Sequence, residues 1–286
     1  MAWGVRAELA GVAVGDGLPV AVMGVINVSP ESFHPGSVYR GEEAIVRAAL
    51  AMVDAGAALV DVGARSTAPY LDADLDEDLE SERLTRAVEL LAAKLPVPVS
   101  ADTCRPGPAR AALDAGARVI NDVSTLRDPA LAGLVAERAA GLILMATPPG
   151  ERTPGTPPRS PSPVAILEDL LASGLRRAVR ARIRQDRIVL DPGIGFFRNA
   201  GIPWHEWDVE VLAKLRALRV LARPLCVGVS RKSFIGEILG RAPTSERLAG
   251  SLAAAAIAVM QGAALIRTHD VAETLDAVRV AERVRR

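Results

Sequence analysis

The sequence predicts an α/β protein built as a single (β/α)8 TIM barrel over residues 1–286. Short apolar runs recur eight times along the chain, and segments with helical periodicity separate them. No change of composition divides the chain, so we expect one barrel rather than two smaller domains. Nearly every apolar run ends in a polar residue, and the carboxyl ends of strands are where such barrels carry their chemistry.

All but one of the predicted strands are short apolar runs that stop at a residue able to hydrogen bond or carry charge. In chain order the runs are residues 20–26 ending at Asn27, 58–60 at Asp61, 97–101 at Asp102, 118–120 at Asn121 and Asp122, 141–145 closing with Met145, 188–190 at Asp191, 225–229 at Ser230, Arg231 and Lys232, and 264–266 at Arg267. Carboxylates, two amides and several cations are therefore expected at one end of the barrel.

The predicted helices lie between these strands. In the first, Ile45, Ala49 and Met52 recur at helical spacing, and Gly56 ends it. In the second, acidic residues near the start interact favourably with the positive end of the helix dipole. The eight helices are expected over residues 40–56, 76–94, 106–116, 128–140, 163–183, 207–220, 244–261 and 270–284. Long loops follow the first, second and fifth strands, over residues 29–39, 65–75 and 146–162.

The composition narrows the function class. The formal net charge is zero, which argues against a nucleic-acid binder and against a protein of anionic membranes. Residues 1–26 contain Arg6, Glu8 and Asp16 and lack the apolar stretch of a signal peptide, and the apolar residues 252–266 are too few for a bilayer span. Cys104 and Cys226 do not make a disulfide framework. We expect a soluble cytoplasmic protein.

The basic residues are strongly biased. Only three of the 34 are lysine, namely Lys94, Lys214 and Lys232. Because the chain otherwise uses arginine for positive charge, we do not expect a lysine at a strand end to be interchangeable with a generic surface cation. Lys232, which follows the seventh strand, is therefore a candidate functional residue.

Seven segments, in order, resemble the signature motifs of dihydropteroate synthases. They are MGVINVSPESF (23–33), DVG (61–63) with ST (66–67), SADT (100–103), VINDVS (119–124), DPGIGF (191–196), GVSRKS (228–233) and RTHDV (267–271). The resemblance covers almost the whole chain. It implies a transferase of folate biosynthesis that joins 4-aminobenzoate to 6-hydroxymethyl-7,8-dihydropterin diphosphate, giving 7,8-dihydropteroate and pyrophosphate.

The strand-end residues suit this chemistry. The edge of a pterin ring carries alternating hydrogen-bond donors and acceptors. The carboxylates of Asp102 and Asp191 and the amide of Asn121 can pair with these groups. Lys232 can donate to a ring nitrogen or carbonyl oxygen as a point charge. The resemblance implies further substrate contacts from the residues Thr67, Met145, Phe196, Ser230 and Arg231.

A diphosphate leaving group requires positive charge. Arg267 and His269 lie two residues apart at the end of the last strand, where TIM barrels often bind phosphate. We expect both to contact the diphosphate and, with Lys232, to serve catalysis. Asn27 resembles the family residue that helps to hold Mg²⁺ with the diphosphate, and an amide plus phosphate oxygens is a plausible donor set. The resemblance further implies a homodimer.

The chain departs from the usual family residues at several positions. His34 replaces a common acidic residue, Ala64 and Arg65 a Gly-Glu pair, Ala68 an arginine, Ala146 a histidine, and Phe197 and Arg198 a Gly-Lys pair. Three hypotheses therefore stay open: a dihydropteroate synthase, a pterin domain that transfers a methyl group from methyltetrahydrofolate to a corrinoid protein, and a pterin-binding paralogue with altered or lost turnover. Of these, the Arg267–His269 pair favours the first, because only its reaction releases a diphosphate.

Overall fold

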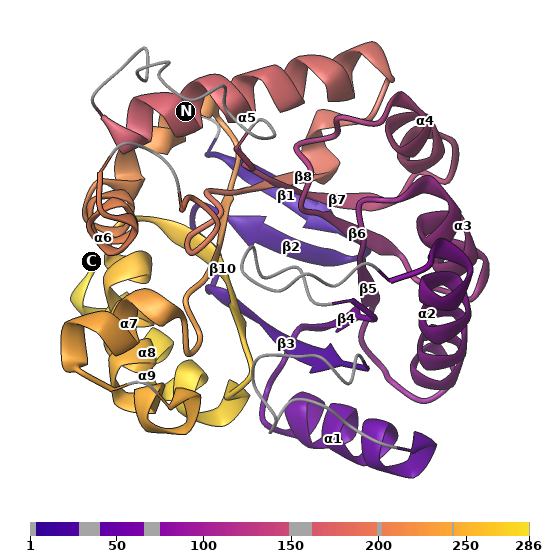
Figure 1. Ribbon diagram of the computed structural model, residues 1–286, viewed down its shortest axis with the longest axis horizontal. Coiled ribbons are helices and arrows are strands. Elements are labelled where there is room, and N and C mark those ends of the chain that lie inside the picture. The colour runs from indigo at the N-terminus through magenta and orange to yellow at the C-terminus, as the bar shows by residue number, and fades with distance from the viewer. Residues whose placement is uncertain are drawn as a thin grey trace.

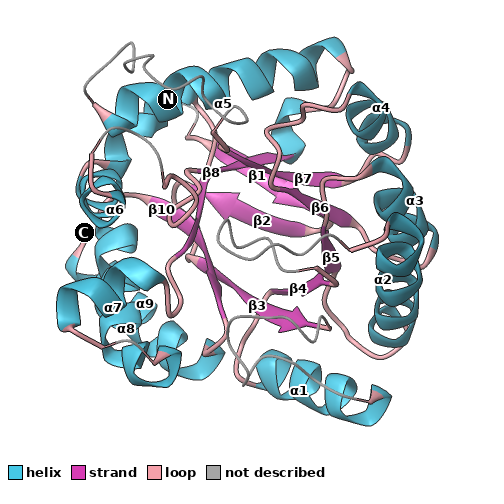
Figure 2. Ribbon diagram, viewed as in Figure 1, coloured by secondary structure: helices cyan, strands magenta, loops and turns pink. Residues whose placement is uncertain are grey.

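A computed structural model describes residues 4–28, 41–65, 75–148, 162–198, 202–241 and 243–285. These residues form a closed barrel of eight parallel strands inside a ring of helices (Figures 1 and 2). The barrel strands are β3 (Ala21–Asn27), β4 (Leu59–Gly63), β5 (Val99–Asp102), β6 (Val119–Asp122), β7 (Gly141–Met145), β8 (Ile188–Asp191), β9 (Leu225–Gly228) and β10 (Ala263–Thr268). Each pairs with the next in the chain, and β10 closes on β3. The predicted fold class is confirmed.

The helices follow the strands in the expected alternation. They are α1 (Glu42–Asp54), α2 (Glu77–Ala92), α3 (Pro106–Asp114), α4 (Pro129–Glu137), α5 (Pro163–Arg180), α6 (Trp204–Ala213), α7 (Ser233–Leu239), α8 (Leu248–Met260) and α9 (Val271–Val284), with 3-10 turns η2 (Gln185–Arg187), η3 (Leu215–Leu221) and η4 (Thr244–Arg247). Asp76 and Asp128 cap α2 and α4 by accepting hydrogen bonds from backbone N–H groups of the first turn.

Three features differ from the sequence prediction. The helix expected over residues 207–220 becomes α6 followed by η3, whose end at Ala222 has a left-handed backbone. The helix α7 was not expected, because seven residues are too few to show a helical period; it forms because Phe234 and Ile235 are buried among the neighbouring helices. An amino-terminal hairpin of β1 (Arg6–Leu9) and β2 (Val12–Gly15) was also missed.

The hairpin covers the amino-terminal end of the barrel. Its strands turn at Ala10 and Gly11, both with positive φ, and alternate between exposed and buried residues. The buried residues Ala7, Leu9 and Val14 join the apolar cluster that fills the barrel interior. The hairpin therefore excludes water from one end of the barrel and leaves the opposite, carboxyl-terminal end for the site.

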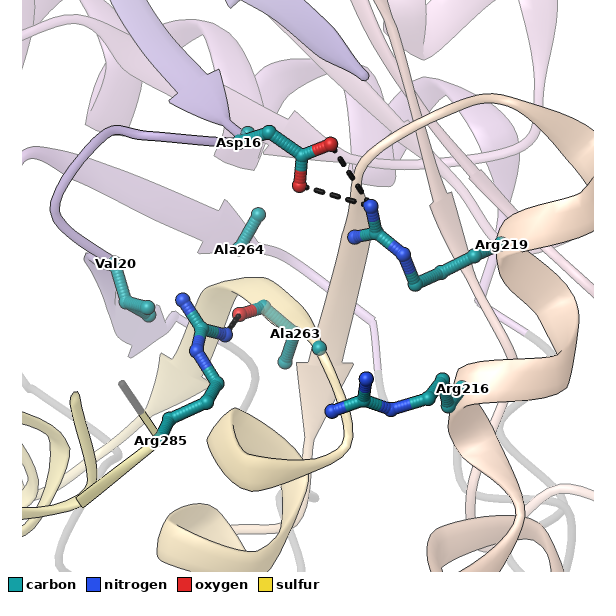
Figure 3. A pocket seen from close by; sticks show the side chains of 9 residues that line it. Asp16, Val20, Arg216, Arg219, Ala263, Ala264 and Arg285 are labelled. Carbon is teal, nitrogen blue, oxygen red and sulfur yellow. Dashed lines mark hydrogen bonds and ion pairs between the residues drawn. The ribbon is translucent and has the colours of Figure 1, made fainter. Parts of the chain in front are cut away.

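A small cavity of about 260 Å³ lies beside this hairpin (Figure 3). Arg219 of η3 donates to both carboxylate oxygens of Asp16, at 2.9 and 2.8 Å, and Arg285 donates to the backbone oxygens of Val259 and Ala263. These contacts fasten the hairpin and the end of α9 to the barrel. Within the described ranges, none of the helices combines the length and apolarity needed to cross a bilayer.

The barrel interior explains how the site is placed. Residues two apart on a strand point to the same face. The inner apolar cluster contains Leu59, Val119, Val189 and Leu265, each two residues before a polar strand-end residue (Asp61, Asn121, Asp191 and Arg267). Residues between them, such as Val60, Ile120, Leu190 and Ile266, pack outward against the helices. A filled apolar layer thus supports a polar layer directly above it.

Candidate active site

Four strand-end side chains form one hydrogen-bonded network at the carboxyl end of the barrel. Arg267 donates from Nε to Asp61 Oδ2 at 2.8 Å and from Nη2 to Asp102 Oδ2 at 2.8 Å. Asn121 Nδ2 donates to the same Asp61 oxygen at 3.0 Å. The network therefore joins β4, β5, β6 and β10 across the barrel.

Because this network is buried, the charges of its side chains interact strongly and shift the pKa values of Asp102 and Arg267. Burial raises the pKa of Asp102, an effect that Arg267 opposes. Burial alone would lower the pKa of Arg267, but the carboxylates of Asp61 and Asp102 outweigh it and raise that pKa. Arg267 is thus a permanent cation. Among the described residues, the buried Asp102 Oδ1 has no hydrogen-bond partner, which leaves an acceptor for a ligand N–H.

A second carboxylate lies at the end of β8. Asp191 Oδ1 accepts the Gly193 N–H at 2.7 Å, and its carboxylate also accepts from the buried Cys226 thiol. Burial raises the pKa of Asp191, and the Gly193 hydrogen bond and Lys232 oppose the shift. Gly193 has a φ of 70°, and a Cβ there would collide with the Ala146 carbonyl oxygen. The glycine lets the loop fold back onto Asp191.

Lys232 lies at the start of α7, and its side chain belongs to the same part of the site as Asp191. Its Nζ lies 4.7 Å from the centroid of the Phe196 ring. Burial and Arg267 lower the pKa of Lys232 to about 8, against the opposite effects of Asp191 and Asp208. Gly195 has a φ of 90°, and a Cβ there would lie only 3.0 Å from Lys232 Cδ. The loop therefore presents a side-chain-free surface to the lysine.

The last group of predicted residues lies at the ends of β3, β9 and β10. Ser230 Oγ lies 2.9 Å from His269 Nδ1 and also accepts the His269 N–H at 3.2 Å, which fixes the orientation of the ring. Asn27 lies beside Gly63, where an added Cβ would be 3.4 Å from Asn27 Oδ1 and 3.8 Å from Asp102 Oδ2. The missing side chain at Gly63 thus leaves space beside both groups.

Comparison with known proteins agrees with this geometry. A sequence model described as "Pterin binding enzyme" matches residues 23–269. The dihydropteroate synthase of Escherichia coli K12 is 38% identical over 261 residues, which cover 91% of this chain and 90% of that protein. The chain belongs to the pterin-binding enzyme family. It is an enzyme, a transferase of the dihydropteroate synthase type.

Solved structures of the family share the whole fold. The Yersinia pestis dihydropteroate synthase, solved with a sulfonamide drug, has a TM-score of 0.87 at 33% identity and 98% coverage of both chains. The Xanthomonas albilineans enzyme with 4-aminobenzoic acid has a TM-score of 0.84 at 37% identity, covering 99% of this chain and 98% of that one. The same enzyme was solved with 7,8-dihydropteroate, with a TM-score of 0.81 at 34% identity and 98% coverage of both chains.

The structure gathers most of the predicted site residues at one end of the barrel. Met145 pairs in register with Asp191, so it belongs to the same strand ends. Arg231 differs: its guanidinium donates to both oxygens of Asp270, at 2.8 and 2.7 Å, and to the carbonyls of Thr244 and Ser245. It serves there as a clamp between β9 and β10, and its contact with substrate stays a prediction. Thr67 lies outside the described residues.

Two departures from the usual family residues have a structural counterpart. Phe197 is buried and stacks on Trp207 at 4.8 Å between ring centroids. The Arg198 guanidinium lies 4.2 Å above the ring of Trp204 and donates to Ser233 Oγ at 2.6 Å. Phe197 and Arg198 therefore hold the loop after β8 against α6 and α7. Ala146 is buried and its N–H donates to the Asp191 carbonyl. His34 and Ala68 lie outside the described residues.

Sequence reasoning missed two carboxylates of the site. Asp61 was recognised only as a strand end and motif residue, yet it accepts from both Arg267 and Asn121. Asp208 lies on α6, away from every strand end, and accepts the Gly195 N–H at 2.8 Å. A possible signal for Asp208 was its position among apolar residues of a helix, between Trp207 and Val209.

Proposed function

We propose that this enzyme condenses 6-hydroxymethyl-7,8-dihydropterin diphosphate with 4-aminobenzoate, giving 7,8-dihydropteroate and pyrophosphate. The observation that carries the proposal is the ring of buried Asp102, Asn121 and Asp191 and partly buried Lys232 above an apolar floor. The relative from Xanthomonas albilineans, solved with 4-aminobenzoic acid and with 7,8-dihydropteroate, supports the choice of substrates.

The pterin is held by complementary hydrogen bonds in this proposal. Asp102 Oδ1 and the Asp191 carboxylate accept N–H groups of the ring, and the Asn121 amide and Lys232 supply the remaining contacts. Asp102 suits this role because one of its buried oxygens awaits a donor. Phe196 and Met145 form apolar wall, and Thr67, Ser230 and Arg231 contact the aminobenzoate side.

The diphosphate is bound by Asn27, Arg267 and His269. Arg267 uses Nε and Nη2 for Asp61 and Asp102, so Nη1 would meet a diphosphate oxygen. The Asn27 amide oxygen borders the space left by Gly63, and an amide with phosphate oxygens is a donor set that Mg²⁺ accepts. The residues therefore fit a magnesium ion carried with the substrate, which would neutralise charge on the leaving diphosphate.

The reaction needs no protein nucleophile. The carbon–oxygen bond at the pterin methylene breaks, pyrophosphate takes the electron pair, the arylamine nitrogen forms the new carbon–nitrogen bond, and an amine proton is released. Arg267 and His269 stabilise the charge that builds on the diphosphate, and the carboxylates stabilise the electron-poor pterin. Ser230 keeps the His269 ring oriented for this contact.

The test is pyrophosphate release from dihydropterin diphosphate with Mg²⁺, measured with and without 4-aminobenzoate. We expect release that depends on the amine and a product that coelutes with 7,8-dihydropteroate. Tight pterin binding with no amine-dependent release would instead support a pterin-binding paralogue. Methyl transfer from methyltetrahydrofolate to a corrinoid protein, without pyrophosphate release, would support the methyltransferase hypothesis.

A homodimer and a cytoplasmic location complete the proposal. Large apolar side chains are exposed on the adjacent helices α7, α8 and α9, namely Ile238, Leu239, Ile257, Met260, Val280 and Val284. Large apolar side chains exposed on neighbouring helices are typical of subunit interfaces. Both cysteines, Cys104 and Cys226, are free thiols, as is usual in a reducing compartment.

A further inference from the structure

Asp208 is a buried carboxylate with a polar partner on a loop of the site. Its side chain lies on α6 and is 1% exposed. Its Oδ1 accepts the Gly195 N–H at 2.8 Å. An asparagine oxygen would accept the same bond without the cost of burying a charge. The loop contact alone therefore does not account for a carboxyl group here.

Gly195 connects Asp208 to Lys232. The glycine N–H points to Asp208, while its Cα side faces the lysine: an added Cβ would be 3.0 Å from Lys232 Cδ and 3.4 Å from Nζ. Phe196, the next residue, places its ring 4.7 Å from Nζ. By holding Gly195, Asp208 fixes the surface along which the lysine side chain extends.

The charges around Lys232 are balanced only if Asp208 is counted. Asp191 on β8 and Asp208 on α6 attract the ammonium group, while Arg267 on β10 and Arg198 on the loop after β8 repel it. Asp208 in turn is faced by Lys232, Arg198 and His205. Without Asp208, one carboxylate would oppose two guanidinium groups beside this partly buried lysine.

We propose that Asp208 is a positioning residue that holds the Lys232 ammonium group charged and directed at the pterin. The inference rests on the proposed function of Lys232 as a donor to the pterin ring. Asp208 touches Gly195 rather than the reacting atoms, so it acts through the loop and through its charge. Burial raises the pKa of Asp208 to about 6, which leaves the group mainly ionised at neutral pH.

The decisive variant is Asp208→Asn, which keeps an acceptor for Gly195 and removes the charge. A protonated Lys232 is the donor, and its pKa of about 8 predicts that pterin affinity falls as pH rises through 8. Losing the Asp208 charge lowers that pKa further, so the fall should begin at lower pH. We expect a displacement of about one pH unit, which makes binding about fivefold weaker at pH 8 and about tenfold weaker above pH 9.

Affinity for 6-hydroxymethylpterin, measured by calorimetry between pH 6 and 9.5, gives this profile, and KM and kcat from pyrophosphate release extend it. We expect the KM for the pterin diphosphate to rise more than kcat falls. The control is Glu210→Gln, which removes a carboxylate of the same helix that pairs with Lys214. Asp208→Ala, which removes both charge and acceptor, should weaken binding at every pH as well.

If Asp208→Asn leaves the pH profile unchanged, the inference is wrong, and Asp208 only holds the loop at Gly195 in place. The Lys232→Met variant separates this result from a failure of the proposed function. If the wild-type pH profile persists in Lys232→Met, Lys232 is not the titrating donor and the proposed role of the lysine fails. If Asp208→Asn changes the profile only when Lys232 is present, the two residues act together as proposed.

Discussion

At the scale of single residues, several charged side chains lie in buried or partly buried positions at the carboxyl end of the barrel. Asp191 is buried there and Lys232 is partly buried, and each modifies the pKa of the other. Burying a charge is costly unless partners compensate. Proteins keep buried charges at ligand-binding sites despite this cost, because a charged donor or acceptor rejects a molecule that lacks the matching group.

Removing either charge should weaken pterin binding strongly. For Lys232→Ala and Asp191→Asn we expect an affinity loss of about 10- to 100-fold each, since a hydrogen bond to a charged group contributes about 1.5–3 kcal/mol. Calorimetry with 6-hydroxymethylpterin measures the loss. Lys214→Ala, which removes a surface lysine paired with Glu210, is the matched control. Affinity close to wild type in either variant would remove that residue from the pocket.

At the scale of elements, the ends of neighbouring strands are joined by specific ion pairs. Arg231, at the end of β9, has a φ of 53° and is 8% exposed. It holds Asp270, which lies between β10 and α9, by two hydrogen bonds, and also holds the backbone at Thr244 and Ser245. The clamp keeps the loops that carry Lys232 and His269 in a fixed relation.

Breaking this clamp should destabilise the fold. Arg231→Ala leaves Asp270 partly buried without its cation, and we expect a loss of about 3–5 kcal/mol in the free energy of unfolding. Urea denaturation followed by circular dichroism measures the change. Arg184→Ala is the control, because Arg184 makes the same two-bond contact with Asp186 on the exposed surface. Equal effects of the two variants would contradict the clamp.

At the scale of the whole molecule, the two barrel ends and the helical ring have separate tasks. The hairpin and its ion pair between Asp16 and Arg219 close the amino-terminal end. The carboxyl-terminal end carries the polar network. The helices α7, α8 and α9, which carry exposed apolar residues, lie on one side of the ring, whereas α5 lies on another side (Figure 1).

The proposed homodimer can be tested through this surface. Ile257 on α8 is 45% exposed, and Val179 on α5 is 50% exposed. We expect Ile257→Lys to shift the protein from dimer to monomer, because a charge at an apolar interface is left without a partner. Val179→Lys should leave the mass unchanged. Sedimentation equilibrium distinguishes the two, and a dimer that survives Ile257→Lys would place the interface elsewhere.

Much of the barrel was predictable because its signals are local. The strands are apolar runs buried on both faces, and nearly every run stops at a polar residue such as Asp102 or Asp191. The hairpin was missed because its strands are only partly buried and alternate over too few residues to show a period, and α7 was missed because it has only seven residues. Short segments gain their stability from packing on the barrel, which no local pattern reports.

The sequence by itself determined the order of the β-α units and the kinds of polar group that end the strands. Only the tertiary structure decided which of these groups meet. Arg267 pairs with Asp61 and Asp102, which lie 206 and 165 residues away in the chain, because closing the barrel brings β10 beside β3. Asp208 reached the site from a helix for the same reason: contacts between distant segments depend on packing in three dimensions, and no residue spacing encodes them.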